Sequence, residues 1–403
     1  MKEFTLTNFF KTVAVVTIFS VCEKFLGFLY RIFLSHTIGA EGIGMYQVAL
    51  SVFALILTLI CSGTPITISR LMTKYRAEGK HNKIEKIITA GLSFTALLAI
   101  PTTIILLLNG NRLSFLFADQ RCLNLFLLIL PALTFSCVYA CLRGVFWGDK
   151  DFLPYSVTEL LEEICMIIAG IILISMAKDV YQGAYFATLA VLISYVFSFT
   201  CSLIIFLIRK HRFKNPKTEF KPLLKSALPI TAMRSANSVT VSLISIILPL
   251  RLVLSGVDNS VAMHMFGSAT GQALPLLSVP TTLIGSFTLV LIPEISENFY
   301  KQKFYYLKRD VEKALQLTIF SSAIFVPVFF VCGAELGVIM FNNYECGEFL
   351  SYSSLLMIFI SLSSITTSIL NSMGLETKTL IYYIIGGLLM MIAVWFLPEF
   401  LGI

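Results

Sequence analysis

The sequence has little charge. Charged side chains make up only 13% of its 403 residues, whereas 57% are hydrophobic and the mean hydropathy is +0.86. Average soluble domains carry about 25% charged residues. Four stretches contain no Asp, Glu, Lys or Arg: 87–108, 123–142, 183–208 and 379–397. Each is close to the length that a helix needs to cross about 30 Å of hydrocarbon. These absences exclude a soluble globular protein.

The sequence also lacks the motifs of common catalytic and metal sites. It contains no H-E-x-x-H, G-x-S-x-G, Walker A or G-x-G-x-x-G pattern. Its four histidines are isolated from one another: His36, His81, His211 and His264. Its nine cysteines include no C-x-x-C pair and no spacing that would hold zinc. The sequence therefore predicts neither an enzyme nor a bound metal or cofactor.

The apolar segments predict an all-α, multi-pass integral membrane protein with about eleven transmembrane helices. Backbone groups in hydrocarbon must be hydrogen-bonded internally, so runs of this length can only be helical. The first run is too long for a cleavable signal and carries Lys24 and Arg31. The predicted spans are 12–34, 45–69, 87–108, 123–142, 158–177, 183–208, 226–254, 266–293, 314–341, 349–373 and 379–400.

The distribution of basic residues predicts the orientation of these spans. The net charge of +7 comes from short basic loops, which is typical of membrane topology rather than of nucleic-acid binding. Twenty-three Lys and Arg residues, Arg143 among them, lie on one side of the predicted topology. Three lie on the other side: Arg112, Arg121 and Lys178. By the positive-inside rule, the N-terminus is cytoplasmic.

Three landmarks recur at nearly one spacing along the chain. The pairs are Pro65 and Pro293, Pro101 and Pro327, and Gly148 and Gly374, separated by 228, 226 and 226 positions. This predicts two homologous halves repeated in parallel, an arrangement typical of transporters. The two halves are an N-terminal six-helix lobe (1–208) and a C-terminal lobe (226–403). A basic cytoplasmic linker (209–225) joins them. The second lobe has only five helices and is expected to be incomplete. A duplicated scaffold or receptor is the alternative.

Four cationic residues fall within the predicted spans. A charge near the bilayer centre costs about 3 kcal/mol on insertion scales, so it is expected to face an interior or a cavity. The four are predicted to form a cationic cavity for an anionic substrate: Lys24, Arg31, Arg234 and Arg251. Snorkelling, or ion pairing with Glu23 or Asp258, is the alternative.

Two further groups of residues are candidates for roles in transport. Glu159, Glu162 and Glu163 open the fifth predicted span, and Glu159 and Glu163 share one helix face. They are candidates for coupling to a proton or cation, or for a solvated position at the interface. Pro275 and Pro280 interrupt the eighth predicted span, and because proline bends a helix, this span is either a gate or a kinked structural helix.

Several strings resemble a known family. Lys24–Arg31, Gly39–Gln47 and the segment from Leu274 to Ser296 are similar to the stage V sporulation protein B family. That family belongs to the polysaccharide branch of the multidrug/oligosaccharidyl-lipid/polysaccharide (MOP) superfamily, whose fold is MATE-like. The resemblance implies a flippase in the bacterial cell membrane that exports a polyprenyl-pyrophosphate-linked sugar. A peptidoglycan precursor for the spore cortex or cell wall is the implied substrate.

Two other functions stay open alongside the flippase. The first is a cation-coupled multidrug exporter of the same superfamily, which should prefer buried carboxylates over the cations found here. The second is a non-transporting membrane scaffold that recruits cell-wall synthesis enzymes, or an inactive fragment. For the flippase, alternating access would be achieved by two lobes moving about a central cavity. Membrane lipids, and no nucleic acid, are the other expected partners.

Overall fold

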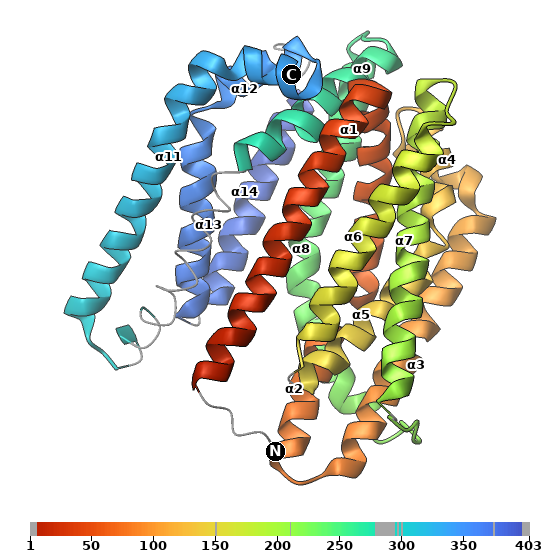
Figure 1. Cartoon of the computed structure of the whole chain (residues 1–403), viewed down its shortest axis with the longest axis vertical. Coiled ribbons are helices and arrows are strands. Elements are labelled where there is room, and N and C mark those ends of the chain that lie inside the picture. Colours follow the sequence, from red (N-terminus) through yellow and green to blue (C-terminus); the bar gives the residue numbers. More distant parts are fainter. Residues whose placement is uncertain are drawn as a thin grey trace. The chain divides into compact units, whose positions relative to one another are not determined.

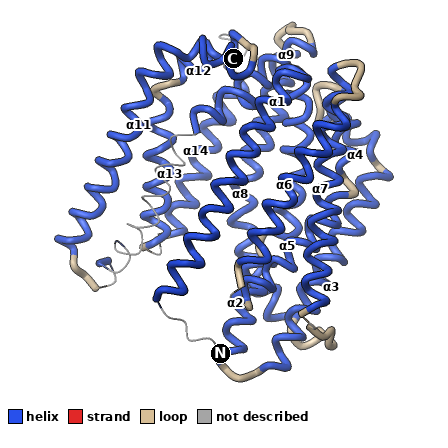
Figure 2. Tube along the Cα trace, in the orientation of Figure 1, coloured by secondary structure: helices blue, strands red, loops and turns tan. Residues whose placement is uncertain are grey.

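The fold is built entirely from helices in the part of the chain that the structure describes. This computed structural model describes residues 6–149, 151–209, 211–278, 295, 298–299, 301–373 and 375–396. Within these ranges there is no strand (Figure 2). The elements labelled in Figure 1, with the two short helices η1 and η2, are α1 (Leu6–Cys61), α2 (Thr64–Ala77), α3 (His81–Leu108), η1 (Gly110–Leu116), α4 (Gln120–Ile129), α5 (Ala132–Gly148), α6 (Leu153–Ile174), α7 (Val180–Ile208), α8 (Phe220–Leu254), α9 (Asn259–Phe266), η2 (Gly267–Ala273), α11 (Phe304–Phe341), α12 (Tyr344–Ser353), α13 (Leu356–Ser372) and α14 (Glu376–Phe396).

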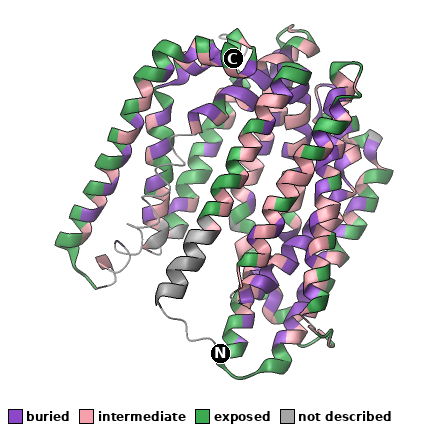
Figure 3. Ribbon diagram, viewed as in Figure 1, coloured by how far each residue is buried: buried purple, intermediate pink, exposed green. Residues whose placement is uncertain are grey.

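The helices are long and apolar enough for a protein that crosses the membrane several times. Six helical runs among the described residues could each span a bilayer, and the number is eight if two bent helix pairs are each one span. The run Ile18–Arg76 has 59 residues, which at 1.5 Å per residue is about 90 Å and far exceeds one crossing. Most large apolar side chains of α14 are exposed, as expected for a helix that faces lipid (Figure 3). The multi-span, all-helical prediction is therefore confirmed.

Several predicted spans are interrupted in the structure. Predicted span 123–142 is divided between α4 and α5, which meet at an angle of 47° beside Pro131. Predicted span 349–373 is divided between α12 and α13, which meet at 63°. Gly39 lies between predicted spans 12–34 and 45–69, which α1 joins, and adopts a φ of 64°, a left-handed conformation that glycine reaches without a Cβ penalty. The hydrophobic runs did not predict the bends within spans 123–142 and 349–373.

The chain divides into two compact units. Unit 1 comprises Met1–Arg31 and Met45–Ile246, and unit 2 comprises Ile32–Gly44 and Ile247–Ile403. The helices α1 and α8 therefore each contribute to both units. The predicted boundaries at 208 and 226 concern duplicated lobes, a property that a division by spatial contact does not test.

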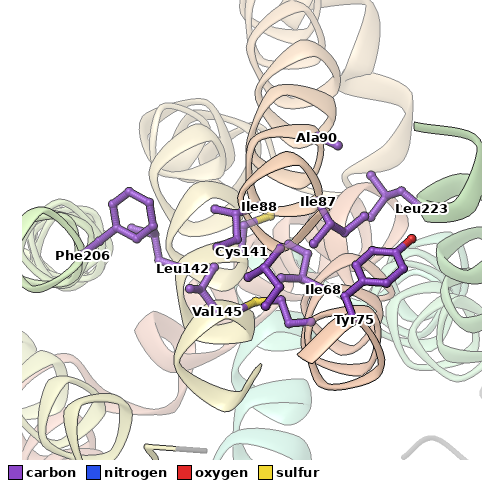
Figure 4. Close-up of a cluster of buried hydrophobic side chains, with 12 residues drawn as sticks. Ile68, Tyr75, Ile87, Ile88, Ala90, Cys141, Leu142, Val145, Phe206 and Leu223 are labelled. Carbon is purple, nitrogen blue, oxygen red and sulfur yellow. The ribbon is translucent and has the colours of Figure 1, made fainter. Parts of the chain in front are cut away.

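A cluster of buried apolar side chains holds one end of unit 1 together. It is formed where α2, α3 and α5 meet, and α7 and α8 each add a residue (Figure 4). Ile68, Ile87 and Cys141 are fully buried at its centre. The cluster comprises Ile68, Met72, Tyr75, Ile84, Ile87, Ile88, Ala90, Cys141, Leu142, Val145, Phe206 and Leu223. The cluster packs α2, α3 and α5 together with α7 and α8, which fixes the positions of these helices within unit 1.

Small residues allow the helices of unit 1 to approach closely. A Cβ at Gly144 of α5 would lie 2.6 Å from the Cα of Pro65 in α2. The backbone N–H of Gly63, which precedes α2, donates a hydrogen bond of 3.1 Å to the hydroxyl of Thr231 in α8. That bond satisfies a donor that the break between α1 and α2 would otherwise leave without a partner.

Three residues at the end of α7 and just after it contact charged side chains of unit 1. Arg209 forms an ion pair of 2.6 Å with Asp151, and the His211 ring lies 3.1 Å from Asp149. The backbone N–H of Arg212 donates to Glu85 at 2.7 Å. These contacts tie Arg209, His211 and Arg212 to the start of α3 and to the segment between α5 and α6.

The charges in this contact alter two pKa values. Hydrogen bonding to Asp149 raises the pKa of His211, and the charges of Asp149 and Glu85 add to the effect, while burial opposes it. Burial alone would raise the pKa of Asp149, but hydrogen bonds from His211 and Arg76 outweigh it and lower that pKa. The charged forms of both side chains are therefore favoured in the folded protein.

Unit 2 is organised around the segment Ile32–Gly44. Gly44 packs against the carbonyl of Met263, and Gly267 packs against the carbonyl of Ala40, each so closely that a Cβ would clash with the backbone. Gly267 begins η2, a π-helix of the kind often found at functional positions. A small-residue crossing of this type lets two membrane helices pack backbone to backbone.

A buried polar network fixes the same segment within unit 2. The Gln272 side-chain amide donates to the Ser35 hydroxyl at 2.7 Å, and Ser35 donates to the Phe341 carbonyl at 2.8 Å. The Asn343 amide donates to Ser268 and to the Gln272 side-chain oxygen, both at 2.7 Å. The network joins three parts of the chain, and hydrogen bonds inside apolar surroundings specify one arrangement of helices.

The crossing at Gly267 gives a direct test of packing in unit 2. We expect Gly267→Ala to lower the free energy of unfolding by about 1–3 kcal/mol, because the new methyl group would overlap the Ala40 carbonyl. The measurement is the thermal unfolding midpoint of the purified protein in detergent. Gly386→Ala is the matched control, since a Cβ at Gly386 would have nothing within 4 Å. Equal midpoints for the two variants would contradict the close crossing.

The contact of His211 predicts a dependence of stability on pH. Because folding raises the pKa of His211 above its ordinary value of about 6.5, its stabilising contribution is complete below that value. The contribution is lost as the pH rises through the folded-state pKa. We expect the wild-type midpoint to exceed that of His211→Gln at pH 6, by an amount equivalent to about 1 kcal/mol, and the difference to shrink by pH 9. A difference that grew with pH would exclude the charged contact.

Candidate functional site

The candidate site in unit 1 is a group of charged side chains on α1, α5 and α6. The three glutamates of α6, Glu159, Glu162 and Glu163, are half-buried rather than solvated. The carboxylate of Glu163 packs against α1, since its Oε1 lies 2.9 Å from the position of a Cβ at Gly27. Half-buried carboxylates on an otherwise apolar helix require nearby partners, which identifies this face as functional or as a structural ion-pair network.

An arginine of α5 provides one of these partners. Arg143 forms an ion pair of 3.0 Å with Glu159 through its NH1 group. Its guanidinium also lies over the rings of Trp147 and Tyr155, at 5.1 and 5.5 Å from their centroids. Tyr155 is within electrostatic range of Glu159 as well. Arg143, Glu159, Trp147 and Tyr155 therefore form a single packed group between α5 and α6.

Three polar atoms beside this group have no hydrogen-bond partner among the described residues. They are Arg143 Nε, Glu162 Oε2 and the Tyr139 hydroxyl, and all are buried. Two are donors and one is a strong acceptor, so the group has hydrogen-bonding capacity that no described residue uses. Unsatisfied buried polar atoms are uncommon in native proteins and call for an explanation such as a binding role.

The predicted cations on α1 lie in the same unit. Lys24 is exposed and adjoins Glu23, which is within electrostatic range of Arg143 and Glu159. Arg31 is half-buried and within electrostatic range of Glu163 and Tyr46. Unit 1 thus presents cations and carboxylates together, where the sequence analysis assigned the cations and the glutamates to separate roles.

The remaining predicted residues are more dispersed. Arg234 is exposed on α8 within unit 1, whereas Arg251, further along α8, belongs to unit 2. Arg251 is buried, donates from Nε to the Trp395 carbonyl at 2.8 Å and lies 4.8 Å from the centroid of the Trp395 ring. Pro275 is half-buried just after η2, and Pro280 lies outside the described residues. The structure groups Lys24, Arg31 and Arg234 in one unit and gives Arg251 a packing partner.

Sequence reasoning missed Arg143. The apolar run predicts that the fourth span ends at 142 and that Arg143 is a cytoplasmic topology residue, whereas α5 continues to Gly148. The signal was present, because Trp147 lies one helical turn after Arg143 and an arginine can stack on an aromatic ring at that spacing. The pairing with Glu159 depends on how α5 and α6 pack, which no local pattern reveals.

The sequence is similar to a known family and to a curated bacterial protein of the same kind. The family described as polysaccharide biosynthesis protein matches residues 9–299. Stage V sporulation protein B of Bacillus subtilis (strain 168) is 26% identical over 395 residues, which cover 94% of this chain and 76% of that protein.

Two solved structures show the same fold. One is described as "Lipid II flippase MurJ, inward closed conformation", with a TM-score of 0.77 and 17% identity, and the match covers 96% of this chain and 82% of that one. The other is an inward-facing multidrug resistance MATE family transporter of the MOP superfamily, with a TM-score of 0.72 and 14% identity, over 94% and 88% of the two chains. The MATE-like fold expected from the sequence is confirmed over most of the chain.

A substitution at Arg251 tests whether its contact with Trp395 stabilises the fold. We expect Arg251→Lys to lower the free energy of unfolding by about 1 kcal/mol, because an ammonium group cannot hold both the Trp395 carbonyl and the ring face. Arg234→Lys, an exposed site on the same helix, is the control and should leave the unfolding midpoint in detergent unchanged. If both variants were as stable as wild type, the packing role of Arg251 would be wrong.

Proposed function

We propose that this chain, which belongs to the polysaccharide biosynthesis protein family, moves a lipid-linked oligosaccharide from the inner to the outer leaflet of the bacterial cell membrane. The observation that carries the proposal is the family match over residues 9–299 of a chain folded into membrane-length helices. The sporulation protein and the lipid II flippase among similar proteins support a peptidoglycan precursor, for the spore cortex or cell wall, as the cargo.

The proposed arrangement in the membrane has eleven spans in two parallel lobes, 1–208 and 226–403, with the N-terminus in the cytoplasm. Alternating access would then come from the two lobes moving about the substrate. The excess of Lys and Arg on one side of the predicted topology supports the orientation. Similar solved structures of a flippase and a transporter support the mechanism by their shared fold.

The substrate's pyrophosphate would be bound by cations of the predicted cavity: Lys24, Arg31, Arg234 and Arg251. Phosphate oxygens form strong charge-assisted hydrogen bonds with arginine and lysine. An inside-negative membrane potential would assist outward movement, at about 2.3 kcal/mol per negative charge for each 100 mV. Because Arg251 already donates a hydrogen bond to the Trp395 carbonyl, it is the least available of the four cations for binding the pyrophosphate.

A second candidate function is a cation-coupled multidrug exporter. The half-buried glutamates Glu159, Glu162 and Glu163 favour it, because carboxylates can bind a coupling cation or a cationic drug. In the flippase, the same residues would serve to couple transport to a cation or proton. Greater sensitivity to cationic dyes in cells lacking the protein would support the exporter, and unchanged dye efflux would exclude it.

A flipping assay tests the proposed function directly. Fluorescent lipid II is incorporated into proteoliposomes, and its exposure to an external quencher is followed over time. We expect wild-type protein to increase exposure, and Lys24→Gln and Arg234→Gln to slow it at least tenfold, since a tenfold loss corresponds to only about 1.4 kcal/mol of lost interaction. Lys178→Gln, an exposed lysine outside the predicted cavity, is the matched control and should flip at the wild-type rate.

The outcomes separate the site from the function. Wild-type rates in both cavity variants would refute the assignment of Lys24 and Arg234 while the flippase function stood. Absence of exposure with well-inserted wild-type protein would refute lipid II as the cargo. The same assay with another polyprenyl-pyrophosphate-linked sugar would then test the wider substrate class.

A further inference from the structure

In the ion pair of Arg143 and Glu159, the arginine packs against two aromatic rings, whereas the glutamate contacts the arginine at one point. The Arg143 guanidinium packs against the rings of Trp147 and Tyr155, which also contact each other, so these rings restrict its position. Its contact with Glu159 uses NH1 alone, at 3.0 Å, and both side chains are partly accessible, with 27% and 20% of their surfaces exposed. A fixed cation whose carboxylate partner is held at one point and is accessible can exchange that partner for another anion.

The guanidinium has hydrogen-bonding capacity to spare. A guanidinium carries five N–H donors in a planar fork, and only one described contact is made to a carboxylate. Arg143 Nε is buried without a hydrogen-bond partner among the described residues, and so are Glu162 Oε2 and the Tyr139 hydroxyl beside it. Phosphate oxygens match the arginine fork in two-point contact better than a single carboxylate oxygen does.

The location of the pair suits the headgroup of a lipid. Arg143 lies six residues before Asp149, which in a helix is about 9 Å from the end of unit 1 that carries the basic segment. Glu159 lies at the same depth, six residues after the start of α6 at Leu153. The hydrocarbon core is about 30 Å of a bilayer that is about 40–45 Å thick. Arg143 follows the predicted span 123–142 and Glu159 opens the predicted span 158–177, so the predicted topology places the pair near the boundary of the hydrocarbon core.

We propose that Arg143 binds a phosphate of the lipid-linked substrate and that Glu159 occupies Arg143 until the substrate arrives. This inference rests on the proposed function and adds to it a residue outside the predicted cavity. Without substrate, Glu159 neutralises a cation that would otherwise be left partly buried and uncompensated, which is costly. When a phosphate takes its place, Glu159 stays within electrostatic range of Tyr155, so the released carboxylate retains a polar neighbour.

Trp147 provides a built-in reporter of this exchange. The chain contains two tryptophans, so Trp395→Phe leaves Trp147, against which Arg143 packs, as the only one. The detergent-solubilised Trp395→Phe protein is titrated with farnesyl pyrophosphate, and the Trp147 emission is recorded. We expect a saturable change in emission, and none with farnesol, which has the same chain without the phosphates.

Variants of the pair give opposite expected shifts. Glu159→Gln should lower the half-saturating concentration about tenfold, because the competing carboxylate is gone, and Arg143→Gln should raise it at least tenfold. Arg143→Lys keeps the charge without the fork and should fall between Arg143→Gln and wild type. Arg121→Gln removes a different ion pair of unit 1, that with Asp119 at 2.7 Å, and should leave binding unchanged.

Each result decides the proposal. Identical titration curves for wild type, Glu159→Gln and Arg143→Gln would overturn the role of the pair, even where lipid II flipping by wild type establishes the function. Weaker binding in Glu159→Gln would also overturn it, since the carboxylate would then assist the phosphate rather than compete with it. Failure of the wild type in both binding and flipping would overturn the proposed function and this inference together.

Discussion

A polar group inside hydrocarbon has no water to bond with, so it must find its partner within the protein. The described helices meet this constraint along most of the backbone, and side chains meet it at two irregular positions. Thr231 accepts the hydrogen bond of Gly63 where α1 ends and α2 begins. Ser35, Gln272 and Asn343 satisfy one another beside the π-helix in unit 2. The irregular positions of the fold are thus the positions where polar side chains collect.

The same constraint explains why small residues recur at helix crossings. Apolar side chains gain little from leaving lipid for protein, so helices associate through close packing and hydrogen bonds. Gly144 and Gly267 each allow a neighbouring backbone to approach to a distance that a Cβ would prevent. These crossings orient α5 in unit 1 and η2 in unit 2. The charged residue Arg143 is carried on α5, which this apolar and glycine packing orients.

Hydrophobic runs predicted the helical, multi-span character of the chain, because the length needed to cross a bilayer is a local property of sequence. They did not predict the bends at Pro131 and at the junction of α12 and α13, since apolar content continues through both. The strings around Lys24 and Gly39 gave the family correctly. They could not give the partners of Arg143 and Arg251, because Glu159 and Trp395 meet them only through packing. Glu159 was recognised as unusual, but its pairing depended on α5 extending past residue 142.

Binding and release of an anion place opposite demands on a membrane cation. A bare arginine in a low-dielectric site would be costly when empty and would hold a diphosphate too tightly when full. An arginine paired with a glutamate avoids both extremes, because the carboxylate compensates the charge in the empty protein and competes for it in the loaded one. The affinity is then set by a difference between two similar interactions rather than by one strong interaction. The mixed charges on α1, α5 and α6 have the composition that such an exchange requires, and a purely cationic cavity does not.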